Sequence, residues 1–352
     1  MDFDFSEEEQ AISDLSQQIF EDTVTHEHLR SLAKSESSFD RDLWATLAST
    51  GVVGATIDEQ FGGSSLSFLG VTALLENVGK YAAPIPALET IITGALPIQE
   101  FGSNEQKTEL LPKIAAGEII VTTALISSGN ATIKDGQVSG SFDFVSFGHE
   151  ADMLLLPTES GAFIVESGSP GITLEPRETT AGHSQAAIVL NNVDAKQLGT
   201  VTSEEFTAWI RLRVDSAICS IIAGACEASL GLASEYTKIR QQFDRAIATF
   251  QAVSQRAGDA YIDTEAVRLT SRQAAWRISV GLPATEQVAI ARWWASEAGF
   301  RVVHAATHLH GGVGVDRDYP LHRYFLMVRQ LELTLGNSEE QLEILGDLMA
   351  KG

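Results

Sequence analysis

The sequence predicts an α+β protein in which an N-terminal helical domain, a central antiparallel β-domain and a C-terminal helical bundle follow one another. Three observations support this fold class. Apolar residues recur at helical spacing up to about residue 118, short β-type runs separated by Gly, Asn and Pro follow, and helical spacing returns near residue 204. We therefore expect three domains, which span residues 1–118, 119–203 and 204–352.

The N-terminal domain carries the start and stop signals of several helices. Ser6 followed by Glu9 predicts a capping box at the start of the first helix. The stretch FDRDLWATLASTG predicts another helix that ends at Gly51, and Gly62 and Gly63 mark a turn. SLSFLGVTALLENVGKYA and NEQKTELLPKIAAGE complete the expected helices of this domain.

The middle and the end of the chain differ in their periodicity. Five runs predict strands because their apolar residues alternate or run continuously over a few positions: EIIVTTALI, QVSGSFDFVSF, ADMLLLPT, GAFIVES and SQAAIVLNNV. Four or five longer stretches predict helices, and four of them lie at about 204–239, 250–280, 284–308 and after residue 338.

Charge and cysteine usage exclude several classes of function. The net charge of −23 argues against nucleic acid and against an anionic membrane surface as partners. No uninterrupted apolar run reaches the length of a membrane span, and the acidic start MDFDFSEEEQ lacks the basic residues of a signal peptide. Cys219 and Cys226 would lie about 10 Å apart along one helix, which is too far for a disulfide. These features predict a cytoplasmic protein without a membrane partner.

Two segments contain residues suited to binding a phosphate-bearing ligand. In RQQFDRAIATFQAV (residues 240–253), the guanidinium of Arg240 suits a pyrophosphate and Phe243 could cover an aromatic ring. In HLHGGVGVDRDYPLHRYF (residues 308–325), Gly311 and Gly312 let the backbone approach a ligand. The competing interpretations are an ordinary helix–helix loop and a glycine-capped helix end.

Other kinds of site have little support. His304 and His308 have the i, i+4 spacing of metal ligands, and His310 lies close by, but no acidic or cysteine ligand stands at a recognisable spacing. We therefore expect no metal. The sequence also lacks G-x-S-x-G, G-x-G-x-x-G and P-loop motifs.

These two segments and the helix–β–helix order resemble the acyl-CoA dehydrogenase family. MDFDFSEEEQ, FGGSSLSFLGVTALLENVGKYAAPIPA and GSNEQKTELLPKIAAGEIIVTTAL are similar to further stretches of that family. The resemblance implies FAD bound between subunits, with the flavin ring on the β-domain of one subunit and the adenosine half on the C-terminal helices of its neighbour. It also implies that the adenosine half is held by six residues of this chain, with Arg240 at the pyrophosphate: Arg240, Phe243, Gln251, His308, Gly311 and Gly312.

The sequence departs from the family at both ends of the cofactor. Asp244 stands where a glycine is usual, and His308 stands where a glutamine is usual. The turn that normally precedes the flavin ring is reduced to ISSGNA (residues 126–131), and the strand that normally faces the ring has the sequence FVSFGHE (144–150). The resemblance therefore implies a well-matched site for the adenosine half and a poorly matched site for the ring.

The catalytic base of the family is also missing. Its glutamate position near the C-terminus holds Leu335, and the alternative position on the helix before RQQFD holds Val214. Asp215 is the candidate base if the register differs by one residue, which would turn it about 100° around the helix.

This combination resembles the short, base-lacking subunit of heteromeric (α2β2) actinobacterial acyl-CoA dehydrogenases that act on steroid side-chain thioesters. The resemblance implies a second dehydrogenase subunit that carries the catalytic glutamate, an acyl-CoA substrate and an electron-transfer acceptor. Two alternatives stay open: a homomeric dehydrogenase that uses Asp215, and a non-enzymatic scaffold of the same fold.

Overall fold

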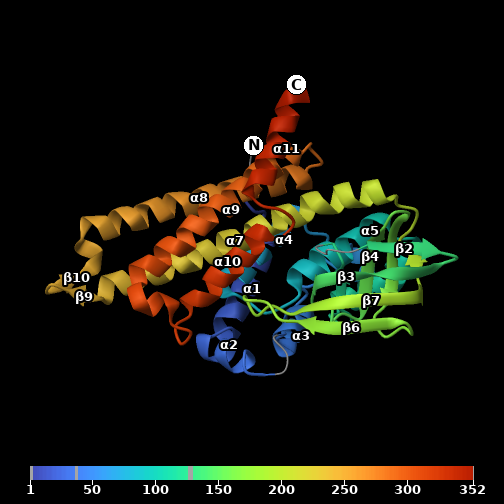
Figure 1. Ribbon diagram of the computed structural model, residues 1–352, viewed down its shortest axis with the longest axis horizontal. Helices are drawn as coiled ribbons and strands as arrows, with labels where there is room; N and C mark the ends of the chain where they lie inside the picture. Colours follow the sequence, from blue (N-terminus) through green and yellow to red (C-terminus); the bar gives the residue numbers. More distant parts are fainter. Residues whose placement is uncertain (1–2, 36–38, 126–129, 352) are drawn as a thin grey trace. The chain divides into compact units, whose positions relative to one another are not determined.

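The computed structural model describes residues 3–35, 39–125 and 130–351 and confirms the expected order of helices, sheets and helices (Figure 1). The chain forms two compact units. Unit 1 comprises residues 1–29, 72–83 and 215–352, and unit 2 comprises residues 30–71 and 84–214. Three helices continue from one unit into the other: α2 (His26–Leu32), α4 (Phe68–Tyr81) and α7 (Ser203–Ile239). The three domain boundaries expected from the sequence stay a prediction.

The helices of unit 2 begin at polar caps that the sequence provides. Asp40 accepts a hydrogen bond from the Leu43 amide at 3.0 Å, and Ser103 forms a capping box with Gln106. Neither η2 nor α5 was expected from the sequence. The element η2 is a rare π-helix, and all eight of its residues are buried. The remaining bounds are α3 (Arg41–Ser49), η1 (Glu59–Phe61), η2 (Leu88–Ala95), α5 (Leu96–Phe101) and α6 (Asn104–Ala115).

Unit 2 also contains two four-stranded sheets, with strand orders β1-β4-β5-β8 and β2-β3-β7-β6. The expected antiparallel pairing holds except that β1 runs parallel to β4. This difference arises because the chain leaves the first sheet after β1, forms the β2–β3 hairpin in the other sheet and returns at the same end. The strands β2, β6 and β8 were not expected, and EIIVTTALI supplies only a short strand. The bounds are β1 (Val121–Thr123), β2 (Asn130–Lys134), β3 (Gln137–Ser146), β4 (Met153–Thr158), β5 (Gly161–Glu166), β6 (Ile172–Arg177), β7 (Gln185–Asp194) and β8 (Lys196–Gln197).

Unit 1 is helical, and its first helix begins as the sequence predicts. The Ser6 hydroxyl accepts from the Glu9 amide at 3.2 Å, and the Glu9 carboxylate accepts from the Ser6 amide at 2.9 Å. The helix α10 was not expected, because the preceding glycine-rich segment indicated only a turn. The bounds are α1 (Glu7–Thr23), α8 (Gln251–Ser279), α9 (Thr285–His310), α10 (Leu321–Leu333) and α11 (Ser338–Lys351).

Two glycines allow α4 and α7 to approach each other closely within unit 1. A Cβ added to Gly79 would lie 1.9 Å from the carbonyl oxygen of Ile221, and one added to Gly224 would lie 1.8 Å from that of Glu76. Neither position has room for a larger side chain. The backbones of the two helices therefore touch directly at this crossing.

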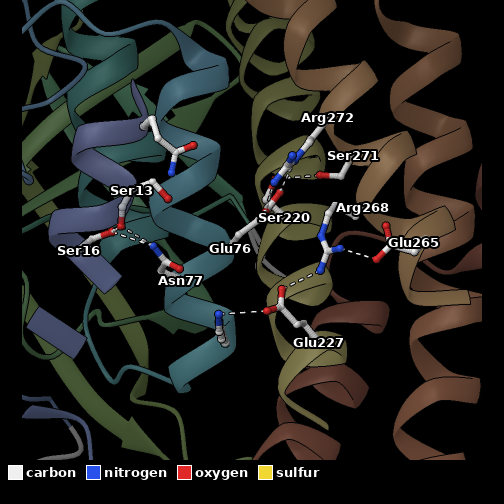
Figure 2. A network of polar contacts seen from close by, with 12 residues as sticks. Ser13, Ser16, Glu76, Asn77, Ser220, Glu227, Glu265, Arg268, Ser271 and Arg272 are labelled. Atoms are coloured by element: carbon white, nitrogen blue, oxygen red, sulfur yellow. Dashed lines mark hydrogen bonds and ion pairs between the residues drawn. The ribbon is translucent and has the colours of Figure 1, made fainter. Parts of the chain in front are cut away.

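A network of ion pairs extends from this crossing to α8 (Figure 2). Arg272 donates two hydrogen bonds to Glu76, at 3.1 and 3.0 Å. Glu227 of α7 accepts from Arg268 at 2.7 Å and lies 3.0 Å from the ammonium of Lys80. These pairs link α4, α7 and α8 through partly buried charges, where screening by water is weaker than at the surface.

The helix α7 forms much of the buried core. It is the one helix in the described part of the chain that is long and apolar enough to cross a membrane, but 72% of its apolar window is buried in the protein. The buried core helix of a globular protein can have the same length and apolar composition as a membrane-spanning helix. Cys219 and Cys226 lie on α7 as free, buried thiols, and burial raises the pKa of each to about 12.

Candidate functional site

The segment between α7 and α8 is a small hairpin at one end of the helical unit (Figure 1). The two-residue strands β9 (Gln241–Gln242) and β10 (Arg245–Ala246) pair in antiparallel register. Phe243 and Asp244 form the turn, and both have left-handed backbone conformations, with φ of +53° and +62°. Aspartate tolerates this conformation well, which explains why the turn forms without the family's usual glycine. The Phe243 side chain is 86% exposed at the tip.

Arg240 lies at the base of this hairpin with its side chain exposed to solvent. Its backbone is fixed, because its amide donates to the carbonyl of Tyr236 and its own carbonyl accepts from the amide of Ile247, each at 2.8 Å. The guanidinium makes no ion pair within the described residues. The neighbouring Arg245 differs, since its guanidinium packs over the Phe250 ring at 4.0 Å.

The start of α8 adds backbone donors beside the hairpin. A 3-10 turn, η3 (Ile247–Thr249), leads into the helix, and Gln251 is the first helical residue, with an exposed side chain. Phe250 occupies the N-cap position and provides no side-chain acceptor for the first amides of the helix. Uncapped amides at a helix N-terminus suit a phosphate.

The second segment follows α9 as a glycine turn, η4 (Gly311–Val315). Gly311 has φ +62° and ψ −137°, a conformation that only glycine adopts readily. Gly312 has no positive φ, and a Cβ at Gly311 or Gly312 would meet no atom within 4 Å. The protein itself does not require a glycine at position 312, so the open space there suits a ligand that approaches the backbone. The His308 side chain beside this turn is exposed.

An apolar cluster brings these segments to the same end of unit 1. It contains Ala233 of α7, Leu309 of α9 and Leu321 of α10, and Val253 and Ala257 of α8 pack against it. We call Arg240, Gln251, Gly311 and Gly312 the clasp. An unpaired guanidinium, an uncapped helix start and an open glycine turn fit the pyrophosphate of FAD. The side chains of Phe243 and His308, which belong to the same two segments, are exposed.

Unit 2 contains the residues expected to face the flavin ring. Phe144 and Phe147 have positive φ, at +56° and +50°, and β3 is irregular between Phe142 and Val145. The Phe144 side chain is 47% exposed. Of the turn ISSGNA, residues 126–129 lie outside the described part of the chain, and Asn130 and Ala131 begin β2.

A small cavity lies behind this strand. Its volume is about 10 Å³, which is about the space of one water molecule and far too small for a flavin ring. Hydroxyl groups and apolar side chains line it together with one carboxyl: Leu88, Glu89, Thr93, Thr122, Thr123, Leu125, Ser146 and Val214. This cavity therefore does not hold the ring half of FAD.

Glu89 is the residue of this cavity that the sequence reasoning missed. It is buried on the π-helix η2, and this burial raises the pKa of its carboxyl to about 7. A hydrogen bond from Ser146 favours the charged form and offsets part of the rise. Buried carboxyls with raised pKa values occur frequently in functional sites. The signal available in the sequence was an isolated glutamate within the apolar run PIPALETIITGALPI.

The two positions at which the resemblance places the family's base hold apolar side chains in different settings. Val214 is fully buried and lines the cavity of unit 2. Leu335 follows α10 in unit 1 with φ +62°, an uncommon conformation for leucine. Neither side chain can take a proton.

Asp215 lies next to Val214 on α7 but has a different environment. Its carboxylate is 3.1 Å from the Arg292 guanidinium, and both side chains are buried. Arg292 also donates to the carbonyls of Leu331, Thr334 and Gly336, so it holds the turn that contains Leu335. This ion pair gives Asp215 a structural role in addition to its candidate role as a base.

The described residues contain no cluster of His, Cys, Asp or Glu that could hold a metal ion. His304 packs between the rings of Phe300 and Phe325, at centroid distances of 4.1 and 4.9 Å. His308 is exposed and His310 is buried, so the three histidines do not share one site.

Profiles of known families match both ends of the chain. The acyl-CoA dehydrogenase N-terminal domain matches residues 6–118, and the acyl-CoA dehydrogenase C-terminal domain matches residues 213–350. The chain is 35% identical to acyl-CoA dehydrogenase FadE27 of Mycobacterium tuberculosis, over 100% of this chain and 99% of the relative. It is 27% identical to FadE28 of the same organism, over 98% of both.

Solved structures show the same fold over nearly the whole chain. A chain of the ChsE4-ChsE5 complex from Mycobacterium tuberculosis is 36% identical with a TM-score of 0.95 over 100% of both chains. A chain of a Tcur3481-Tcur3483 steroid ACAD variant is 35% identical with a TM-score of 0.92 over 98% of both. Butyryl-CoA dehydrogenase from Megasphaera elsdenii is 26% identical with a TM-score of 0.89, over 99% of this chain and 100% of that one.

Proposed function

Because the chain belongs to the acyl-CoA dehydrogenase family, we propose that it is the subunit of a heteromeric dehydrogenase that lacks the catalytic carboxylate and holds the adenosine half of FAD for its partner. The family consists of oxidoreductases that act on a CH–CH bond, and its cofactor is FAD. The proposal concerns how this chain divides that work with a second subunit.

The observation that carries the proposal is the contrast between the two half-sites. The clasp in unit 1 has a free guanidinium, an uncapped helix and an open glycine at Gly312. On the side of the flavin ring, the family's usual turn is reduced to ISSGNA (residues 126–131), and the positions of the catalytic base hold Val214 and Leu335. A chain that provides only the site for the adenosine half of FAD needs a partner subunit that provides the site for the flavin ring.

Similar solved structures support a partner subunit. Two similar structures, the ChsE4-ChsE5 complex and the Tcur3481-Tcur3483 steroid ACAD, each combine two differently named proteins. We therefore propose an α2β2 heterotetramer in the cytoplasm whose substrate is an acyl-CoA thioester, with a steroid side chain as the acyl group. An electron-transfer acceptor would then reoxidise the flavin.

The chemistry assigns different tasks to the two subunits. The partner's glutamate would take the α-proton of the thioester, and FAD supplies the acceptor for the hydride from the β-carbon. In this chain, Arg240 would neutralise the pyrophosphate, and Gly311 and Gly312 would allow the backbone to approach the cofactor. Gln251, Phe243 and His308 would contact the adenosine half.

The proposal is tested by flavin retention in the assembled complex. A hydrogen bond between arginine and phosphate contributes about 10- to 100-fold in affinity, so Arg240→Ala should weaken FAD binding by that factor. Arg245→Ala is the matched control, because it removes an exposed arginine of the same hairpin that packs on Phe250. Flavin content is measured after gel filtration of each complex.

A second control tests the ring side of unit 2. Phe144→Ala should leave the flavin content unchanged, because in this proposal no flavin ring rests on Phe144. Loss of flavin from Phe144→Ala together with retention in Arg240→Ala would mean that the two halves are assigned the wrong way round.

The two alternatives give different results in the same preparation. A homomeric enzyme that uses Asp215 would bind flavin and turn over acyl-CoA when this chain is expressed alone. A scaffold would carry no flavin with any partner.

A further inference from the structure

His310 is a buried histidine directly before the two glycines of the clasp, and only 3% of its surface is exposed. Its Nδ1 lies 2.7 Å from the carbonyl oxygen of Ala306, so Nδ1 carries the proton and donates. Its Nε2 is then an acceptor and lies 3.0 Å from the hydroxyl of Tyr319. The ring is therefore fixed by a hydrogen bond on each nitrogen.

The same ring connects the glycine turn to the end of α7. It stacks on the Tyr236 ring with a centroid distance of 4.6 Å and an interplanar angle of 27°. The Tyr236 carbonyl accepts the amide of Arg240 at 2.8 Å. A short series of direct contacts thus runs from Gly311 through His310 and Tyr236 to Arg240.

We propose that His310 is a positioning residue that holds the glycine turn at a set distance from Arg240, so that both reach the same FAD molecule. This inference rests on the proposed function of the clasp. Gly311 and Gly312 have no side chains with which to anchor the turn, and Arg240 extends into solvent from the end of a helix. A fixed ring between the two segments reduces the cost of ordering them when the cofactor binds.

The structure also indicates why a histidine suits this position. A phenylalanine would stack on Tyr236 but would leave the Ala306 carbonyl and the Tyr319 hydroxyl without this partner. Burial lowers the pKa of His310, which keeps the ring neutral and its Nε2 able to accept.

The test measures FAD dissociation from the assembled complex for His310→Phe and His310→Gln. Loss of one or two hydrogen bonds should weaken FAD binding roughly 3- to 10-fold in His310→Phe. His310→Gln keeps a polar group near Nε2 and should restore most of the affinity. His304→Phe is the matched control, since it makes the same replacement on the same helix outside the clasp and should not change FAD binding.

A double-mutant cycle separates positioning from a general structural effect. If His310 acts by placing the turn relative to Arg240, adding His310→Phe to Arg240→Ala should weaken FAD binding by much less than it does alone. Additive effects, or an unchanged affinity in His310→Phe, would overturn the inference. If His310→Phe does not fold, Tyr319→Phe removes only the hydroxyl that donates to Nε2 and carries the same prediction.

The failure of this inference can be told apart from the failure of the proposed function. An Arg240→Ala complex that keeps its flavin contradicts the clasp itself. A complex that loses flavin with Arg240→Ala but not with His310→Phe contradicts only the role of His310.

Discussion

The carboxyl of Glu89 is buried without an ion-pair partner among the described residues. Its folded-state pKa of about 7 lies above the usual value of 4.5, mainly because burial disfavours the charge and secondarily because Glu150 repels it. The folded protein therefore binds more protons than the unfolded chain between these two values. The free energy of unfolding must fall as the pH rises through this window.

Glu89→Gln should remove this loss of stability. The shift from 4.5 to about 7 corresponds to roughly 3 kcal/mol at a pH above both values. The difference in unfolding free energy between the variant and the unaltered protein should increase in favour of the variant by roughly 2–3 kcal/mol from about pH 5 to about pH 8. Urea unfolding at the two pH values measures this difference. Glu109→Gln, an exposed carboxyl on α6, is the control. An advantage of Glu89→Gln that is equal at both pH values would contradict the prediction.

The buried pair of Asp215 and Arg292 can be separated from a catalytic role by a second set of variants. Asp215→Asn leaves the Arg292 charge buried without its ionised partner, which typically costs about 3–5 kcal/mol of unfolding free energy. The double variant Asp215→Leu with Arg292→Met removes both charges and should recover most of that stability. Denaturant unfolding of this chain measures both effects.

Turnover of the assembled complex decides what Asp215 does. If Asp215 only pairs with Arg292, the stable double variant keeps nearly full activity. A fall of about 100-fold or more in a well-folded double variant would identify Asp215 as the general base and favour the homomeric alternative.

Among the elements, the crossing of α4 and α7 depends on glycine. Gly224→Ala would place a methyl group 1.8 Å from the Glu76 carbonyl oxygen, so the helices must separate. Overpacking of this kind costs about 1–3 kcal/mol or more, and the variant should unfold at a lower temperature. Gly231→Ala on the same helix meets nothing within 4 Å. It should be neutral or slightly stabilising, because alanine favours helix. Equal melting temperatures for the two variants would disprove the close approach.

The ion pairs in Figure 2 belong to the same elements. Arg272 and Arg268 of α8 reach carboxylates of α4 and α7, respectively. Because the side chains are only partly buried, each pair contributes modestly to stability, and the glycine contacts set the helix spacing.

For the whole molecule, the two half-sites predict the flavin stoichiometry. Only one complete site forms per pair of unlike subunits if this chain supplies an adenosine half and the partner supplies the ring half. We expect one FAD per heterodimer, measured as flavin absorbance against protein concentration in the purified complex. Two FAD per heterodimer would require a ring site in this chain as well, and that result would contradict the proposed division of the two halves.

Features that depend on neighbouring residues could be predicted from the sequence. The capping box of Ser6 and Glu9 and the ends of the long helices are of this kind. Each arises from residues a few positions apart, and the same side chains form the same local contacts in the folded protein. The resemblance of the segments around Arg240 and Gly311 to those of a known family implied a ligand site there, and that site stays a prediction.

Other features depended on segments that are distant in the sequence, and only the tertiary structure decided them. The parallel pairing of β1 with β4, the burial of Glu89 and the ion pair of Asp215 with Arg292 each require elements that fold together from separate parts of the chain. A carboxylate has the same sequence signature whether it faces water, a cavity or a guanidinium. Its chemistry is set by desolvation and by nearby charges, and both follow from packing.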